Sequence, residues 1–95
     1  MKWALTPRAR RDLEDIWKYS AARWGLDQAD DYVRALISVV RRIAKDPPSA
    51  KACDDIRKGY RRRPSGSHML FVRIEVDQLV VVRILHQRMD PDRHL

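Results

Sequence analysis

The side chains best suited to chemistry gather near the end of the chain, in the segment RILHQRMDPDRHL of residues 83–95. His86, Arg88 and Asp90 follow an apolar run there within five positions. An imidazole titrates near neutral pH and a guanidinium binds phosphate, so the pattern is typical of acid–base chemistry on a phosphodiester. A metal-free ribonuclease needs a base for the 2′-hydroxyl, cations for the charge developing on phosphate, and an acid for the leaving oxygen.

The other parts of a ribonuclease would have to come from the basic segment and the loop before it. The full set of candidates is Asp55, Arg62, Arg63, His86 and Arg88. A second clear acid–base group is missing, and no Phe, Tyr or Trp follows Phe71 to stack an RNA base near the tail. RNA cleavage is therefore a hypothesis that the sequence leaves open but does not favour.

Other kinds of site have less support. The histidines lack the HExxH spacing of zinc sites, and no glycine-rich phosphate loop is present, so we expect neither a metal nor a cofactor. Cys53 is the only cysteine, so no internal disulfide can form and nothing argues for secretion. No apolar stretch nears the roughly 18 residues of a membrane helix. These features predict a cytoplasmic chain that does not span a membrane.

The charge of the chain indicates an anionic partner. The net charge is +7, and one stretch without any acid carries six basic residues: Arg57, Lys58, Arg61, Arg62, Arg63 and Arg73. Such a stretch favours nucleic acid or an acidic protein segment as the partner. Tyr60 beside three arginines is a weak match to the basic and aromatic mixture of nucleic-acid sites, and it suits an acidic peptide equally well.

The elements that must position these residues begin with a short strand and two helices. Residues 1–5 suggest the strand, and Thr6-Pro7 begins a helix, because Thr caps free N–H groups and Pro loses no hydrogen bond at the first helical position. An apolar stripe at helical spacing follows until Gly25, which ends the helix. Asp27 is expected to cap a second helix, which Pro47-Pro48 ends. The short link predicts an antiparallel hairpin of helices.

Three strands are predicted for the second half of the chain, after an irregular polar segment. They are YRRRP after Gly59, residues 68–76 and residues 79–85. Pro64-Ser65-Gly66 is expected as the first turn, and Asp77-Gln78 as the second. The whole chain, residues 1–95, is expected to form one domain.

The alternation of side chains assigns each face of the last two strands. The face that would seat the helices carries Leu70, Val72, Ile74, Val81 and Leu85, with Arg83 as a lone polar intruder. The opposite face carries Met69, Phe71, Arg73, Val80, Val82, Ile84 and His86. That second face would expose a large apolar patch, which either binds a partner or is covered by a loop or the C-terminal tail.

Five stretches in this order resemble the ParE branch of the RelE/ParE toxin superfamily, small toxins of bacterial toxin–antitoxin pairs. They are LTPRARRDLEDIWKYSAARWG, QADDYVRAL, KDPPS, IRKGYRRRPSGSHMLFVRIE and VVVRILHQRMDP. The resemblance implies an α+β, RelE/ParE-like fold, in which a two-helix antiparallel hairpin packs on a small, twisted, mainly antiparallel sheet in the order β-α-α-β-β-β. It also implies a function as the toxin of a type II toxin–antitoxin system.

The resemblance further implies a partner and a target. The partner is a cognate ParD-like antitoxin, usually of the ribbon-helix-helix type, which wraps the toxin in a hetero-oligomer and is the part that binds operator DNA. ParE toxins with an assigned target generally poison DNA gyrase and block replication, whereas RelE-type relatives cut mRNA on the ribosome.

The resemblance also helps to choose between these two activities. In the nucleases the first strand after the helices supplies arginines, and Arg62 or Arg63 stands in that place here. Their last strand ends in an aromatic residue, where this chain has His86 and Arg88, and Asp55 is only a loose match to their base. Gyrase inhibition without enzymatic activity is therefore the leading interpretation. A ribosome-dependent or free mRNA endoribonuclease is the alternative.

Two contact surfaces follow from the leading interpretation. The antitoxin is expected to place apolar side chains beside the helices and on the open sheet face, and acids on the arginines. Its contact residues would be Trp17, Trp24, Tyr60, Arg61, Arg62, Arg63, Met69 and Phe71. The target is expected at the exposed end of the sheet, on His86, Arg88, Met89, Asp90 and Arg93.

Overall fold

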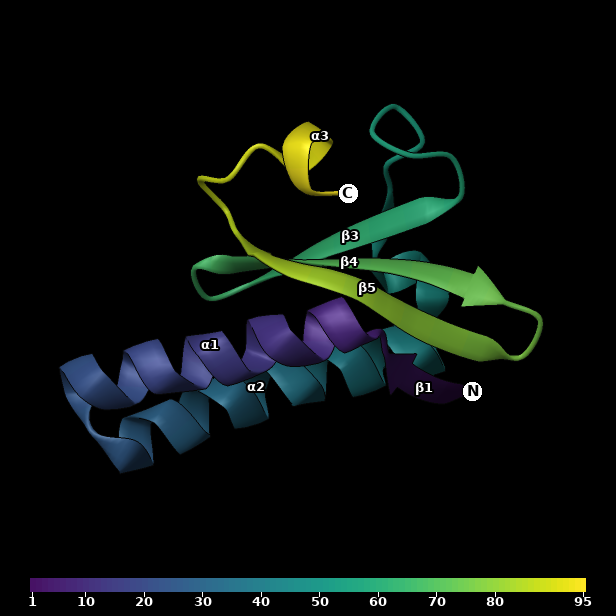
Figure 1. The fold of residues 1–95 in the computed structure, drawn as a ribbon. Coiled ribbons are helices and arrows are strands. Elements are labelled where there is room, and N and C mark those ends of the chain that lie inside the picture. Colours follow the sequence, from purple (N-terminus) through teal and green to yellow (C-terminus); the bar gives the residue numbers. More distant parts are fainter.

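The chain folds into a helical hairpin that covers one face of a five-stranded sheet, as the computed structural model of residues 1–95 shows (Figure 1). The elements are β1 (Lys2–Leu5), α1 (Pro7–Trp24), α2 (Leu26–Lys45), the 3-10 helix η1 (Pro47–Ser49), β2 (Lys51–Ala52), β3 (Tyr60–Ser65), β4 (His68–Glu75), β5 (Gln78–His86) and α3 (Pro91–His94). The predicted order of one strand, two helices and three strands is confirmed, with η1, β2 and α3 as additions. Neither long helix is apolar enough over its length to cross a membrane.

The helical hairpin turns on one residue, Gly25. Its N–H closes α1 on the carbonyl of Ala21, and its own carbonyl accepts from Ala29 at the start of α2. A φ of 96° at this position suits glycine, which explains why the sequence has no side chain there. The prediction that Asp27 caps α2 is wrong, because Gly25 occupies the cap position and Asp27 lies in the first turn of the helix. Its carboxylate still favours the positive end of the helix dipole.

The sheet has the strand order β1-β5-β4-β3-β2, with β1 parallel to β5 and every other pair antiparallel. The pairing of Glu75 with Gln78 makes Val76 and Asp77 the turn between β4 and β5, one residue earlier than predicted. The first turn is also shorter than predicted, because β3 continues through Pro64 to Ser65. Pro64 lies beyond the two residues of β2, where β3 is an edge strand and a missing N–H costs little.

A β-bulge in β5 decides which residues face the helices. Val81 pairs with Val72 and Arg83 pairs with Phe71, so Val82 is an extra residue with no partner on β4. One extra residue reverses the alternation of every side chain that follows it. The carbonyl of Val82 accepts the hydroxyl of Thr6 at 2.7 Å, which fixes the bulge against the start of α1.

The bulge overturns part of the predicted face assignment. Ile84 packs in the main core with the helices, although it was expected on the opposite face. Leu85 packs with Phe71 on that opposite face, although it was expected under the helices. His86 likewise pairs with His68 on the helix side. The main core consists of Ala9, Ile16, Leu36, Val40, Ile43, Ala44, Ala50, Leu70, Val72, Leu79, Val81 and Ile84.

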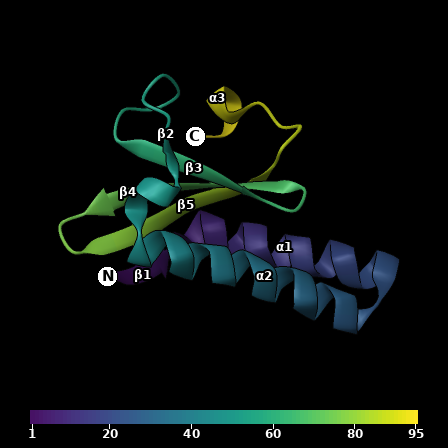
Figure 2. The ribbon, with the colours of Figure 1, turned by 180° about the vertical axis from the view of Figure 1, so that it is seen from behind.

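The chain itself covers the sheet face opposite the helices. Figure 2 shows α3 and the loop between β2 and β3 on that side. Cys53, Phe71 and Leu85 form a small second core there, packed against partly buried Ile56 and Leu95. Of the two possibilities open in the sequence, coverage by a loop and the C-terminal tail is therefore confirmed. The arrangement leaves no open apolar sheet for a partner.

Candidate functional site

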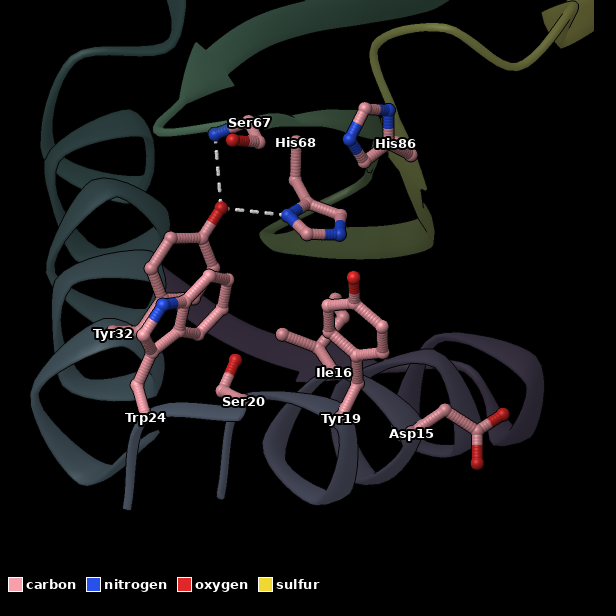
Figure 3. Close-up of a pocket in the computed structure, with 9 residues that line it drawn as sticks. All are labelled: Asp15, Ile16, Tyr19, Ser20, Trp24, Tyr32, Ser67, His68 and His86. Carbon is pink, nitrogen blue, oxygen red and sulfur yellow. Dashed lines mark hydrogen bonds between the residues drawn. The ribbon is translucent and has the colours of Figure 1, made fainter. Parts of the chain in front are cut away.

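A pocket of about 370 Å³ lies where the helical hairpin meets the turn between β3 and β4 and the end of β5. Its lining is Asp15, Ile16, Tyr19, Ser20, Trp24, Tyr32, Ser67, His68 and His86. Figure 3 shows that residues of α1 face the two imidazoles across the hollow. The volume falls within the range of small ligand sites or of a pocket for a side chain.

Tyr32 connects α2 to the sheet and fixes one wall of the pocket. Its hydroxyl accepts the backbone N–H of Ser67 at 2.9 Å and lies 2.6 Å from Nδ1 of His68 (Figure 3). When His68 is neutral with its proton on Nε2, the hydroxyl donates to Nδ1 while it accepts from Ser67. The Tyr32 ring also packs closely against Gly66 in the turn between β3 and β4. A Cβ added at Gly66 would lie only 2.7 Å from the Tyr32 hydroxyl.

His68 and His86 form a cross-strand pair with ring centroids 5.4 Å apart. The backbone N–H of Arg88 donates to Nδ1 of His86 at 3.1 Å, so Nδ1 of a neutral His86 is an acceptor. A neutral His86 therefore carries its proton on Nε2. Burial lowers the pKa of His68 below its usual range, and the neighbouring His86 lowers it further.

Aromatic side chains on α1 form the open rim of the pocket. Tyr19 and Trp24 are 58% and 54% exposed, although both are large and largely apolar. The guanidinium of Arg23 lies 5.5 Å from the centre of each ring and pairs with no carboxylate. This rim combines unburied aromatic surface with an unpaired cation, which is the composition expected at a protein contact.

The pocket lacks the lining cations that a phosphodiester-cleaving site needs. It holds two imidazoles, the carboxylate of Asp15 and a hydroxyl from Ser20, but none of the residues lining it is an arginine or a lysine. No group of three or more His, Cys, Asp or Glu side chains is placed to hold a metal ion. The walls can accept an apolar group, and the histidines add two N–H donors.

The structure separates the predicted ribonuclease residues on two sides of the sheet. His86 faces the helices, whereas Arg62 stands opposite Phe71 on the tail side, near Cys53 and Asp55. Side chains of directly opposed residues share a face, so the guanidinium of Arg62 and the imidazole of His86 do not meet. The predicted set therefore forms no single catalytic group.

The three consecutive arginines are divided in the same way. Arg61 and Arg63 pair with Val72 and Leu70, which face the helices, and Arg62 pairs with Phe71, which faces the tail. Neighbouring residues of a strand point to opposite faces, so the three arginines predicted to bind the antitoxin do not form one basic surface. Arg61 also donates to the carbonyl of Ala50 at 2.8 Å.

The apolar residues predicted to contact the antitoxin lie in different places. Trp24 belongs to the pocket rim, and Trp17 lies outside the pocket, where its Nε1 donates to Asp30 of α2 at 2.8 Å. Phe71 is only 2% exposed, so its prediction as a surface residue is wrong. Met69 and Tyr60 are half-buried beside it, on the tail side.

The residues predicted to contact the target mostly follow β5 and are exposed. Arg88, Met89 and Asp90 form the connection to α3, and Arg93 lies within α3. The carboxylate of Asp90 accepts the N–H of Asp92 at 3.0 Å and so caps that short helix. His86 belongs to the pocket rather than to this exposed group.

Sequence reasoning missed Tyr19, Tyr32 and His68 as pocket residues. Tyr32 lay within the apolar stripe of its helix, and its hydroxyl contact depends on how α2 crosses the turn. His68 lies opposite His86 only because of the bulge at Val82, and no residue of the strand indicates that bulge in the sequence. One signal was available in the sequence. His68 begins one predicted strand and His86 follows the end of the next, so an antiparallel pair would bring the two histidines to the same end of the sheet.

Comparisons with known proteins agree over almost the whole chain. Residues 4–91 match the model of a family described as ParE toxin of type II toxin-antitoxin system, parDE. A Mycobacterium tuberculosis protein named Toxin ParE1 is 47% identical over 99% of this chain and 97% of its own length. A Caulobacter vibrioides protein, also named Toxin ParE1, is 44% identical over 98% of this chain and 96% of its own length.

Solved structures show the same fold. The chromosomal ParDE toxin–antitoxin system from P. aeruginosa matches with a TM-score of 0.79 at 17% identity, over 90% of this chain and 95% of the other. A YoeB/ParE toxin from Agrobacterium tumefaciens matches with a TM-score of 0.67 at 19% identity, over 92% and 99%. The expected α+β, RelE/ParE-like fold is confirmed.

Proposed function

Because the chain belongs to the ParE toxin family of type II toxin–antitoxin systems, we propose that it inhibits DNA gyrase, blocks replication and is silenced by a cognate antitoxin. The antitoxin is ParD-like, of the ribbon-helix-helix type, and is the part of the hetero-oligomer that binds operator DNA. Toxin, antitoxin and gyrase meet in the cytoplasm. The toxin acts by binding and needs no cofactor.

The separation of the candidate catalytic residues supports binding rather than catalysis. A ribonuclease must hold its acid, its base and its cations around one phosphate. Arg62 lies on the face of the sheet opposite His86, and Arg63, although on the helix side, is not among the lining residues of the pocket that contains His86. This geometry is the observation that favours gyrase inhibition over mRNA cleavage.

The pocket and the charge of the chain support neutralisation by an antitoxin. The rim residues Tyr19 and Trp24 leave aromatic surface in solvent, which a partner would bury with a gain in free energy. The net charge of +7 favours an acidic partner segment. We assign the antitoxin to the helix side of the molecule, and the exposed residues Arg88, Met89 and Arg93 to the target.

Induction of the toxin alone, followed by comparison of DNA breaks with RNA ends, tests this function. We expect gyrase-linked DNA breaks and an SOS response, with transcripts intact. Co-expression of the antitoxin should restore growth. Arg62→Ala and His86→Ala serve as controls, since neither should abolish the DNA breaks of a toxin that does not use these residues for cleavage.

The same experiment separates the alternatives. Mapped RNA ends that disappear in both alanine variants, without DNA breaks, would establish the ribonuclease instead. Absence of any growth defect would indicate a binding module that has lost its toxicity.

A further inference from the structure

On the premise of the antitoxin proposed above, we propose that the pocket receives an apolar side chain of the antitoxin, and that the complex loosens in mild acid because His68 and His86 must be uncharged while that side chain is seated. The pocket then has two roles. It anchors the antitoxin, and it makes the strength of the anchor depend on pH.

The walls of the pocket favour an apolar occupant. Ile16 is buried at its base, and the rings of Tyr19, Trp24 and Tyr32 form much of the remaining surface. An apolar side chain that leaves water for such a site contributes about 1.5–3 kcal/mol. The Tyr32 hydroxyl and both Nδ1 atoms are already engaged, so these polar groups are not free to bind a polar ligand.

The charge around the pocket favours the antitoxin over a second copy of this chain. Arg23 stands at the rim without a carboxylate, held over the rings of Tyr19 and Trp24. A second copy of a chain with a net charge of +7 would meet this cation with like charge. An antitoxin segment with an apolar residue beside an acidic one would fill the pocket with the first and pair the second with Arg23.

The hydrogen bond to His86 requires a neutral ring, and burial favours a neutral His68. A proton on Nδ1 of His86 would oppose the N–H of Arg88, which donates to that atom. At His68, whose Nδ1 lies 2.6 Å from the Tyr32 hydroxyl, burial disfavours the charged ring. Burial by an occupant would remove water from both rings and would disfavour the charged form further.

The other charged groups near the pair do not reverse this preference. From α1, Asp12 favours charged His68 weakly, because its carboxylate is held by Arg83 of β5. Asp15 lines the pocket but is exposed to solvent, which screens its charge. The rim cation Arg23 opposes a charged ring. Burial and the mutual repulsion of the two imidazoles are the larger effects on the pKa of His68.

The sign of the pH dependence follows from linkage. A seated side chain lowers the pKa of each histidine that it buries, so the free toxin binds more protons than the complex does. The affinity is therefore full above the pKa of the free histidines and falls as pH drops through it. A ring that stays neutral in the complex costs about tenfold in affinity one pH unit below the pKa that it has in the free toxin.

The test is the dissociation constant of toxin and purified cognate antitoxin, measured between about pH 7.5 and pH 5.5. We expect about tenfold weaker binding at the acid end for the natural toxin. The double variant His68→Gln, His86→Gln should lose this dependence, since glutamine does not titrate but can still accept a hydrogen bond. His94→Gln is the matched control, because His94 lies in α3 outside the pocket, and it should behave as the natural toxin.

A second pair of variants tests the anchor itself at neutral pH. Trp24→Ala should weaken antitoxin binding about tenfold or more. Leu26→Ala should not, because Leu26 is also an exposed apolar residue at the hairpin tip but lies outside the pocket. Affinity that is independent of pH, or that rises in acid as a bound carboxylate would produce, overturns the inference. Equal affinity of Trp24→Ala and natural toxin also overturns it. Failure to bind the antitoxin at any pH would instead refute the function proposed above.

Discussion

At the scale of single residues, one buried ion pair closes the open edge of β5. Arg83 donates to both carboxylate oxygens of Asp12, at 2.8 and 3.0 Å, and its third contact is the carbonyl of His94 at 2.9 Å. Asp12 also accepts the backbone N–H of Ile84, at a position where β1 no longer pairs with β5. The pair thus joins α1, β5 and α3, and it satisfies a strand edge that would otherwise be unpaired.

Asp12→Ala should destabilise the fold strongly. The side chains of Arg83 and Asp12 are only 9% and 14% exposed, so removal of the carboxylate leaves a charge with little access to water. Loss of one partner of such a pair costs about 3–5 kcal/mol, which urea unfolding would measure. Asp31→Ala is the control, because its pair with Arg34 is about three-quarters exposed on both sides and is worth at most about 1 kcal/mol. Equal losses in the two variants would contradict this account of the edge.

The structural role of a single residue could be predicted only where its hydrogen-bond partners lie nearby in the sequence. Thr6 as the cap of α1 is confirmed, with its hydroxyl accepting from Ala9 at 3.0 Å, because capping involves residues three apart. The partners of Arg83 and Tyr32 lie 71 and 36 residues away, and no spacing rule in the sequence relates them. Arg83 looked like an intruder in an apolar strand for this reason.

At the scale of elements, the apolar pattern predicted the strands and helices. It did not predict which side chains of β5 face the helices, because that depends on one β-bulge. The positions of α1, α2, β4 and β5 agree with the sequence to within a few residues. The bulge at Val82 then exchanges the sides of Ile84 and Leu85. Val82 is an ordinary strand residue, and the bulge is held by the distant hydroxyl of Thr6, so periodicity could not reveal it.

The C-terminal tail is a structural cover, which changes what its deletion can report. Leu95 packs on the second core of Cys53, Phe71 and Leu85, and its carbonyl accepts from Arg57 in the loop across the sheet. If a truncated toxin failed to act, the cause could therefore be either a lost contact with the target or a disrupted fold. Substitution of the exposed residues Arg88 and Arg93 is the better probe of target binding.

Deletion of residues 89–95 should uncover the second core. We expect a loss of about 2–4 kcal/mol in the free energy of unfolding, the amount that one or two large apolar side chains contribute by burial. The thiol of Cys53 is 1% exposed and burial raises its pKa, so both exposure and ionisation should increase on deletion. The rate of reaction with a thiol reagent measures this. Arg93→Ala should leave the thiol protected, and an unreactive thiol in the truncated chain would show that the tail is not the cover.

At the scale of the whole molecule, the sheet divides the surface into a helix side and a tail side. The pocket, Arg61 and Arg63 lie on the helix side, and Arg62 lies with Phe71 on the tail side. The net charge and the run of arginines could be read from the sequence, but not their distribution, because it depends on which residue of β3 pairs with which of β4. A basic run in a strand supplies two surfaces rather than one.

Adjacent arginines on opposite faces therefore allow a matched test of where the antitoxin binds. Arg63→Glu places a negative charge on the helix side and should weaken antitoxin binding about tenfold or more, since reversal of a contact charge opposes an acidic partner. Arg62→Glu makes the same chemical change one residue away on the tail side. It should alter the dissociation constant by less than about threefold, or roughly 0.7 kcal/mol.

The loss in Arg63→Glu should shrink at high salt, because the effect is electrostatic. Circular dichroism of both variants verifies that the fold is kept. A larger loss for Arg62→Glu than for Arg63→Glu would place the acidic segment of the antitoxin on the tail side and would separate it from the pocket. Losses of the same size would mean that the antitoxin senses only the net charge of the toxin, which both variants change equally.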